Sequence, residues 1–152
     1  MALSGPAHRA PAQSQPNTAA RKFGYLIAIA LNVVFFYLVN VRPGWQALPF
    51  LTHETPQVLS VLNFSLMATI VVNTAYLFFD APWCKALGDF LLAAIALAVL
   101  QRTWQVFPFT FTGWPILLIH TVLVVAVIGT VIAMIINIVS FVRHFVGKRQ
   151  ER

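Results

Sequence analysis

The chain has 152 residues, of which 59% are hydrophobic and 9% are charged. Soluble domains carry about 25% charged residues because their surfaces face water, so this composition excludes an ordinary soluble domain and indicates a membrane protein. The formal net charge of +6 does not indicate nucleic-acid binding, because the basic residues flank the apolar segments, as membrane topology requires.

The N-terminal segment, residues 1–21, is rich in Ala, Pro, Gln and Ser. This composition predicts a disordered cytoplasmic tail. The apolar segment that follows is long enough to span a membrane, and Val41-Arg42-Pro43-Gly44-Trp45 does not resemble a small-residue cleavage site. We therefore expect the first apolar segment to be retained as a membrane helix.

Four apolar segments are long enough to cross the hydrocarbon core, which takes about 20 residues in a helix. They cover residues 23–41, 57–79, 86–106 and 115–142. Proline-containing breaks separate them, and the short connections favour antiparallel neighbours. The sequence predicts an all-α membrane protein, an antiparallel up-down-up-down four-helix transmembrane bundle over residues 22–143, with a basic cytoplasmic tail at residues 144–152.

Basic residues indicate the orientation of the spans. With four spans, one side of the membrane receives Arg21, Lys22, Lys85, Arg143, Lys148, Arg149 and Arg152, whereas the other receives Arg42 and Arg102. The positive-inside rule then predicts a multi-pass plasma-membrane protein with both termini in the cytoplasm. Candidate lipid-interface residues are Trp45, Trp104, Trp114 and Arg102 on the outer side and Trp83 on the inner side.

Six of the polar side chains within the spans are candidates for function, because polar groups are costly in the membrane. They are Asn32, Asn63, Asn73, Asp89, His120 and Asn137. By depth they form two layers with a mainly apolar middle, so no continuous path for protons or ions is evident. Bonding between helices explains such residues as well as a ligand site does.

Small and polar residues also share one face of each span, which favours close helix packing. We expect these faces to form the seam of the bundle. They carry Tyr25, Ala28 and Asn32 on the first span; Ser60, Asn63, Met67, Ile70 and Thr74 on the second; Asp89, Ala93, Ala96 and Thr103 on the third; and Ala126, Thr130, Ala133 and Asn137 on the fourth.

Asp89 allows two interpretations. It pairs with Lys85, four positions earlier, or lies at the positive end of its helix; alternatively, it forms a proton or cation site with Asn73 and Asn137. Two histidines, His53 and His120, suggest a metal or haem hypothesis, but their spacing matches no metal motif. We expect no cofactor, no metal site and no catalytic residue.

The motifs Arg42-Pro43-Gly44-Trp45-Gln46-Ala47-Leu48-Pro49-Phe50-Leu51, Phe79-Asp80-Ala81-Pro82-Trp83, Lys85-Ala86-Leu87-Gly88-Asp89 and Trp104-Gln105-Val106-Phe107-Pro108-Phe109 carry a resemblance. The chain resembles small four-span actinobacterial integral membrane proteins of unassigned function. The resemblance covers roughly residues 42–142. It implies a bacterial plasma-membrane location and no activity or site.

These observations favour an integral membrane scaffold or accessory subunit without catalytic chemistry. Its expected partners are the lipid bilayer and a second copy or another membrane protein, and not nucleic acid. The alternatives are a small oligomeric transporter or channel, based on the intramembrane polar residues, and a haem- or metal-binding redox protein, based on the histidines.

Overall fold

The computed structural model describes residues 18–79 and 81–150, with side chains described as far as Arg143. Within these residues the elements are α1 (Thr18–Asn40), the 3-10 helix η1 (Trp45–Ala47), α2 (Thr55–Phe78), α3 (Pro82–Val106) and α4 (Trp114–Gln150). An isolated antiparallel bridge joins Leu51 to Phe109. All four α-helices are long and apolar enough to cross a membrane, which defines a multi-pass membrane protein with the predicted all-α fold.

The helices extend furthest beyond the predicted spans at three ends. Helix α1 begins at Thr18, so residues 18–21 are helical rather than part of a tail, whereas residues 1–17 lie outside the described part. Helix α3 begins at Pro82, because proline suits the first position of a helix. Lys85 therefore lies in the first turn of α3. Helix α4 continues to Gln150, since a helix satisfies its own backbone groups and extends readily beyond the hydrocarbon layer.

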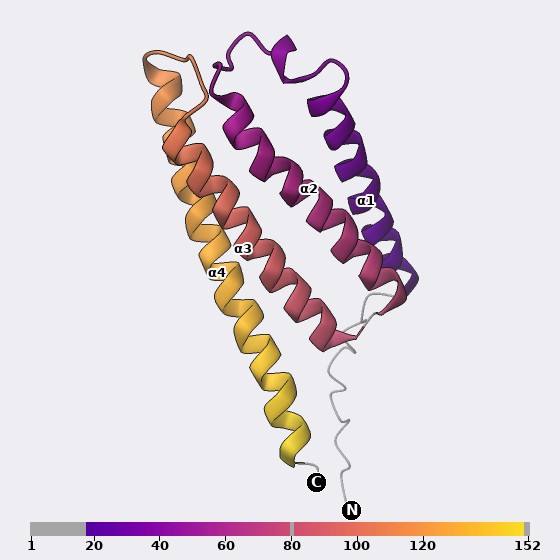
Figure 1. Ribbon diagram of the computed structural model, residues 1–152. Helices are drawn as coiled ribbons and strands as arrows, with labels where there is room; N and C mark the ends of the chain where they lie inside the picture. The colour runs from indigo at the N-terminus through magenta and orange to yellow at the C-terminus, as the bar shows by residue number, and fades with distance from the viewer. Residues whose placement is uncertain (1–17, 80, 151–152) are drawn as a thin grey trace, which may run out of the picture.

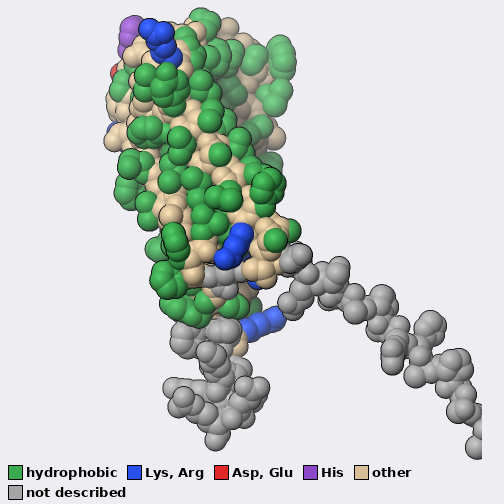
Figure 2. Space-filling model, turned by 90° about the vertical axis from the view of Figure 1, so that its right-hand side faces the viewer, with side chains coloured by type: hydrophobic (Ala, Val, Ile, Leu, Met, Phe, Trp, Pro, Cys, Tyr) green, Lys and Arg blue, Asp and Glu red, His purple; other side chains and the backbone are tan. Residues whose placement is uncertain are grey.

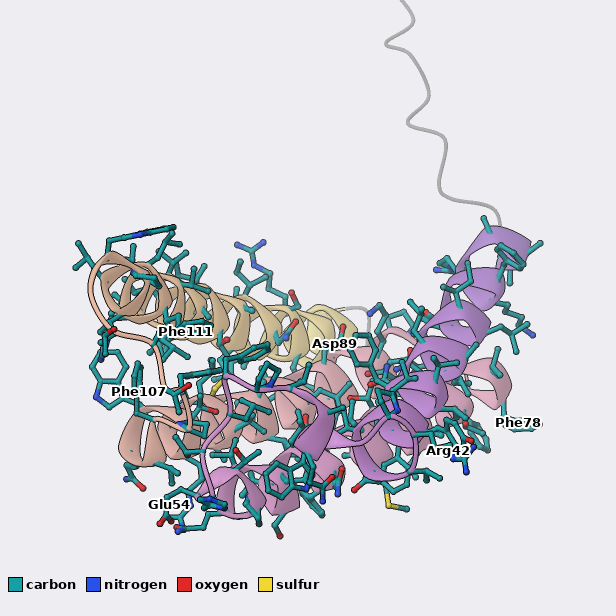
Figure 3. The ribbon with its side chains drawn as sticks, turned by 90° about the horizontal axis from the view of Figure 1, so that it is seen from above. Arg42, Glu54, Phe78, Asp89, Phe107 and Phe111 are labelled. Carbon is teal, nitrogen blue, oxygen red and sulfur yellow. The ribbon has the colours of Figure 1, made fainter. Side chains whose placement is uncertain are left out.

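The four helices form a row in chain order (Figure 1), and consecutive helices run antiparallel. Extensive packing joins α1 to α2, α2 to α3 and α3 to α4. Seen from above, the row is curved (Figure 3), with α1 and α4 at its two edges. We call the end at which α1 and α3 begin the terminal end, and the end that carries η1 and the α3–α4 connection the cap end.

Few side chains are buried, as expected where lipid rather than water surrounds the helices. Among the described residues the buried ones are Tyr25, Thr55, Val58, Asn73, Tyr76, Ala86, Ala93, Pro108 and Leu123. Figure 2 shows hydrophobic side chains covering the length of one face, with basic side chains toward both ends. This distribution fits a membrane-spanning body with polar ends.

The predicted seam is correct on α1 and α3, where Tyr25 and Ala93 are buried. It was wrong on α2, because Ser60 is exposed and Met67 is 55% exposed, whereas Asn73 and Tyr76 are buried. The apolar side chains of α2 project from all sides of this helix. Its sequence therefore carries no amphipathic signal to show which face packs against the two neighbouring helices.

Gly88 of α3 is buried against the end of α2. A Cβ atom at this position would lie 2.8 Å from both Tyr76 Cζ and Val72 Cγ1, and would overlap the Tyr76 hydroxyl. Small residues allow this kind of close contact between membrane helices. Gly88 is therefore the residue that permits Tyr76 to lie across α3.

We expect Gly88→Ala to lower the free energy of unfolding by about 1–3 kcal/mol, because overpacking a tight contact forces neighbouring side chains to move. Gly24→Ala is the matched control, since a Cβ at Gly24 meets nothing within 4 Å. The measurement is unfolding in mixed micelles followed by tryptophan fluorescence. Equal stability of the two variants would contradict the close contact.

Candidate functional site

The main polar cluster lies at the terminal end and joins α2 to α3. Tyr76 Oη lies 2.9 Å from the Lys85 carbonyl oxygen and 3.0 Å from Asp89 Oδ1, so its one proton is shared between two acceptors. Lys85 Nζ donates to Asp89 Oδ2 at 2.5 Å and lies 5.3 Å from the centre of the Tyr76 ring. Both oxygens of Asp89 therefore have partners. The predicted pairing with Lys85 is confirmed.

Tyr76 was missed as a site residue because it lies outside the set of charged and amide side chains. The sequence did contain a pattern that predicts the contact. Tyr76 and Lys85 lie at similar distances in sequence on either side of the connection between α2 and α3. In an antiparallel hairpin such positions meet at the same depth. The Tyr25 ring of α1 also packs on Tyr76, with centroids 5.3 Å apart and planes at 54°, so the cluster involves three helices.

A hollow of about 270 Å³ opens beside this cluster, between α1, α3 and α4. It is lined by Arg21, Pro82, Lys85, Ala86, Asp89, Asn137 and Ser140. The structure therefore brings Asp89 and Asn137 to one hollow, as the cation-site hypothesis requires. Asn73 is not part of it, because Asn73 is buried on α2 and its Nδ2 donates to Thr69 O at 2.8 Å.

Asn63 forms a second polar contact toward the cap end. Its side-chain amide and that of Asn40 donate to each other, with N–O distances of 2.7 and 2.8 Å. This reciprocal pair joins α1 to α2. The sequence named Asn63 as a candidate but did not pair it with Asn40, because pairing depends on the rotation of both helices about their axes.

Asn32 and His120 bond within their own helices. Asn32 Nδ2 donates to Ala28 O at 2.8 Å, and His120 Nδ1 lies 2.9 Å from Ile116 O. The His120 ring stacks on Phe107 at 4.7 Å between centroids and meets Trp104 edge-on at 5.2 Å. Residue 120 thus belongs to an aromatic cluster.

His53 is exposed, and none of the described contacts joins it to His120 on α4. The described residues contain no group of three or more His, Cys, Asp or Glu side chains suited to a metal ion. The haem or metal hypothesis gains no geometric support from this arrangement.

The proposed lipid-interface residues differ in their surroundings. Trp114 is 75% exposed, whereas Trp83 and Trp104 are 45% and 47% exposed and Trp45 is half-buried. Arg102 Nη2 donates to Gln57 Oε1 on α2 at 3.0 Å, and Gln57 also bonds to Glu54. Arg102 therefore has a partner inside the protein in addition to any lipid contact.

A cavity of about 460 Å³ lies beneath the cap between α1, α2 and α3. Its lining residues are Phe35, Leu38, Val39, Pro43, Gly44, Trp45, Leu48, Leu51, Thr55, Val58, Leu59, Leu62, Val99, Thr103, Pro108 and Phe109. The Thr55 and Thr103 hydroxyls donate to the carbonyl oxygens of Thr52 and Val99. The cavity therefore suits a hydrocarbon group, and its volume is typical of small-molecule pockets.

Comparison of the chain with protein-family models, with curated proteins and with solved structures found no match.

We expect Tyr76→Phe to lower the free energy of unfolding by about 1–2 kcal/mol, because the carboxylate of Asp89 loses a hydrogen-bond donor. Tyr37→Phe, at an α1 ring that is 51% exposed, serves as the control and should have little effect. Detergent unfolding curves of both variants provide the measurement. A loss of equal size at Tyr37 would contradict a specific role for the Tyr76 hydroxyl.

A double-mutant cycle tests the Asn40–Asn63 pair. Replacing each by Leu should show a coupling energy of about 0.6–1.7 kcal/mol, the range found for hydrogen bonds between membrane helices. The control cycle combines Asn63→Leu with Asn32→Leu, whose side chain bonds to Ala28 O on its own helix, and should be additive within about 0.5 kcal/mol. Additivity in both cycles would rule out the reciprocal contact.

Proposed function

We propose that the protein is an integral membrane scaffold or accessory subunit without catalytic chemistry. The observation that carries this proposal is the open row of helices, in which α1 and α4 form the edges and each packs extensively on only one neighbour. An edge helix in a membrane has a long face available to another helix. The function that this architecture supports is association with a membrane partner, in the first instance a second copy of the chain.

Internal bonding of the polar side chains supports a structural rather than a conducting role. Asn40 pairs with Asn63, and Asp89 is held by Tyr76 and Lys85. No buried side-chain nitrogen or oxygen lacks a hydrogen-bond partner among the described residues. Polar groups that bond to the protein itself stabilise a fixed arrangement of helices.

The α4 face that continues from the terminal hollow carries two small residues. Gly129 and Ala133 precede Asn137 at intervals of four residues, so the three share one side of the helix. Asn137 and Arg21 of α1 line the same hollow. This side of α4 therefore faces α1. Gly129 and Ala133 are nevertheless exposed, so this side has room for a closely packed helix of a partner.

The same proposal includes the orientation and the membrane. Arg21, Lys22, Lys85 and Arg143 lie at the terminal end of the described structure. The positive-inside rule supports a cytoplasmic location for this end and for both termini, in a plasma membrane.

A small oligomeric transporter or channel is the second candidate. The specific observation in its favour is the hollow shared by Asp89 and Asn137. The bonds from Tyr76 and Lys85 to both Asp89 oxygens weigh against it, because a carboxylate that carries ions or protons must exchange its partners.

We expect the full-length chain to form a defined oligomer in mild detergent, measured by light scattering coupled to size-exclusion chromatography. Ala133→Leu should dissociate it, because a large side chain blocks close approach of a partner helix. The matched control is Ala98→Leu, at an exposed position of α3, which should leave the oligomer unchanged. A monomeric wild-type chain would refute self-association.

A further inference from the structure

Charged side chains from two helices converge on the hollow at the terminal end. Arg21 comes from the first turn of α1 and Lys85 from the first turn of α3, whereas Asn137 and Ser140 come from α4. Figure 3 shows Asp89 on the inner side of the curved row, between α4 and α1. Three helices that are far apart in sequence thus contribute polar groups to one volume of about 270 Å³.

The charges in the hollow favour an anion. Arg21 and Lys85 supply two positive charges and Asp89 one negative charge, which leaves a formal excess of +1. Asp89 Oδ2 accepts from Lys85 and Asp89 Oδ1 from Tyr76, so the carboxylate is compensated by the protein itself. A lysine ammonium has three N–H donors, so Lys85 keeps donors beyond its bond to Asp89. The Arg21 guanidinium carries five N–H donors.

Neutral side chains in the hollow also favour an anion. The Asn137 amide and the Ser140 hydroxyl are hydrogen-bond donors that suit the oxygens of a phosphate group. Pro82, the first residue of α3, also lines the hollow. The hollow therefore lies beside the positive end of the α3 dipole, which favours negative charge nearby.

The surroundings indicate the source of the anion. Lys22 is exposed one residue beyond Arg21, and Arg143 is exposed on α4 three residues beyond Ser140. Leu26 follows Lys22 by four residues on α1, and Ile136 precedes Ser140 by four residues on α4, so each shares a side of its helix with that polar residue. Both apolar side chains are exposed. Basic groups beside exposed apolar side chains match a phospholipid, whose phosphate and chains require the two environments next to each other.

We propose that this hollow binds the phosphate group of an anionic phospholipid. The proposal is separate from the scaffold function, since it requires neither self-association nor a protein partner. Its chemistry is recognition of a phosphate by Arg21 and Lys85, with Asn137 and Ser140 as neutral donors, and no bond of the lipid is broken.

The test is native mass spectrometry of the full-length chain released from vesicles that contain equal amounts of phosphatidylglycerol and phosphatidylcholine. The wild-type chain should retain phosphatidylglycerol preferentially. Arg21→Gln should reduce this retention about fivefold, since a basic residue at a lipid surface contributes about 1 kcal/mol. Lys22→Gln is the matched control, because Lys22 is exposed and does not line the hollow, and it should change retention less than twofold.

A second variant tests lipid binding in the hollow without a change in net charge. Ser140→Leu fills the hollow without changing the net charge, and it should lower phosphatidylglycerol retention while helicity, followed by circular dichroism, is unchanged. Adding inorganic phosphate distinguishes the two sources of the same chemistry. Retention that persists in phosphate supports a lipid site, whereas displacement by phosphate would overturn the lipid assignment.

Two further outcomes would overturn the proposal. One is equal retention of both lipids by the wild-type chain. The other is an equal loss in Arg21→Gln and Lys22→Gln, which would indicate general attraction between a basic surface and anionic lipid rather than a site. The monomer and the oligomer are resolved by mass in the same spectrum, so the result is independent of self-association.

Discussion

The contact between Tyr76 and the first turns of α3 is the interaction on which the arrangement of the helices depends. A carboxylate in a membrane helix requires compensation, because hydrocarbon does not solvate charge. Lys85 and the Tyr76 hydroxyl supply it to Asp89. The tyrosine reaches this position because Gly88 has no side chain, so a charge requirement and a steric requirement are met at the same place.

The two ends of the molecule contain openings of opposite character for the same structural reason. Consecutive helices pack as pairs along a curved row, and the concave side of a row is not filled as the centre of a closed bundle is. Beneath the cap, aromatic and aliphatic side chains surround the resulting space. At the terminal end, the helix ends bring charged groups to it, because basic residues collect where helices leave the hydrocarbon layer.

Most of the candidate polar residues in the membrane helices form hydrogen bonds within the protein. Asn32, Asn73 and His120 bond to carbonyl oxygens of their own helices, and Asn63 bonds to a neighbouring helix. Such bonds remove the cost of placing a polar group in hydrocarbon. The hollow at the terminal end differs, because hydrogen-bond donors and charged groups line an open volume there. Chemical recognition of a ligand is therefore concentrated there.

The sequence by itself determined the four membrane helices and offered the Lys85–Asp89 pair as one interpretation of Asp89, because the length of an apolar segment and a spacing of four residues are local properties. The boundaries at Thr18 and Pro82 differed from those expected, since helices extend past the apolar segment. Only the tertiary structure decided the Tyr76–Asp89 and Asn40–Asn63 contacts and the two openings. These depend on how each helix is rotated about its axis and on which helices are neighbours, and a helix such as α2, apolar on every side, carries no sequence pattern that specifies its rotation.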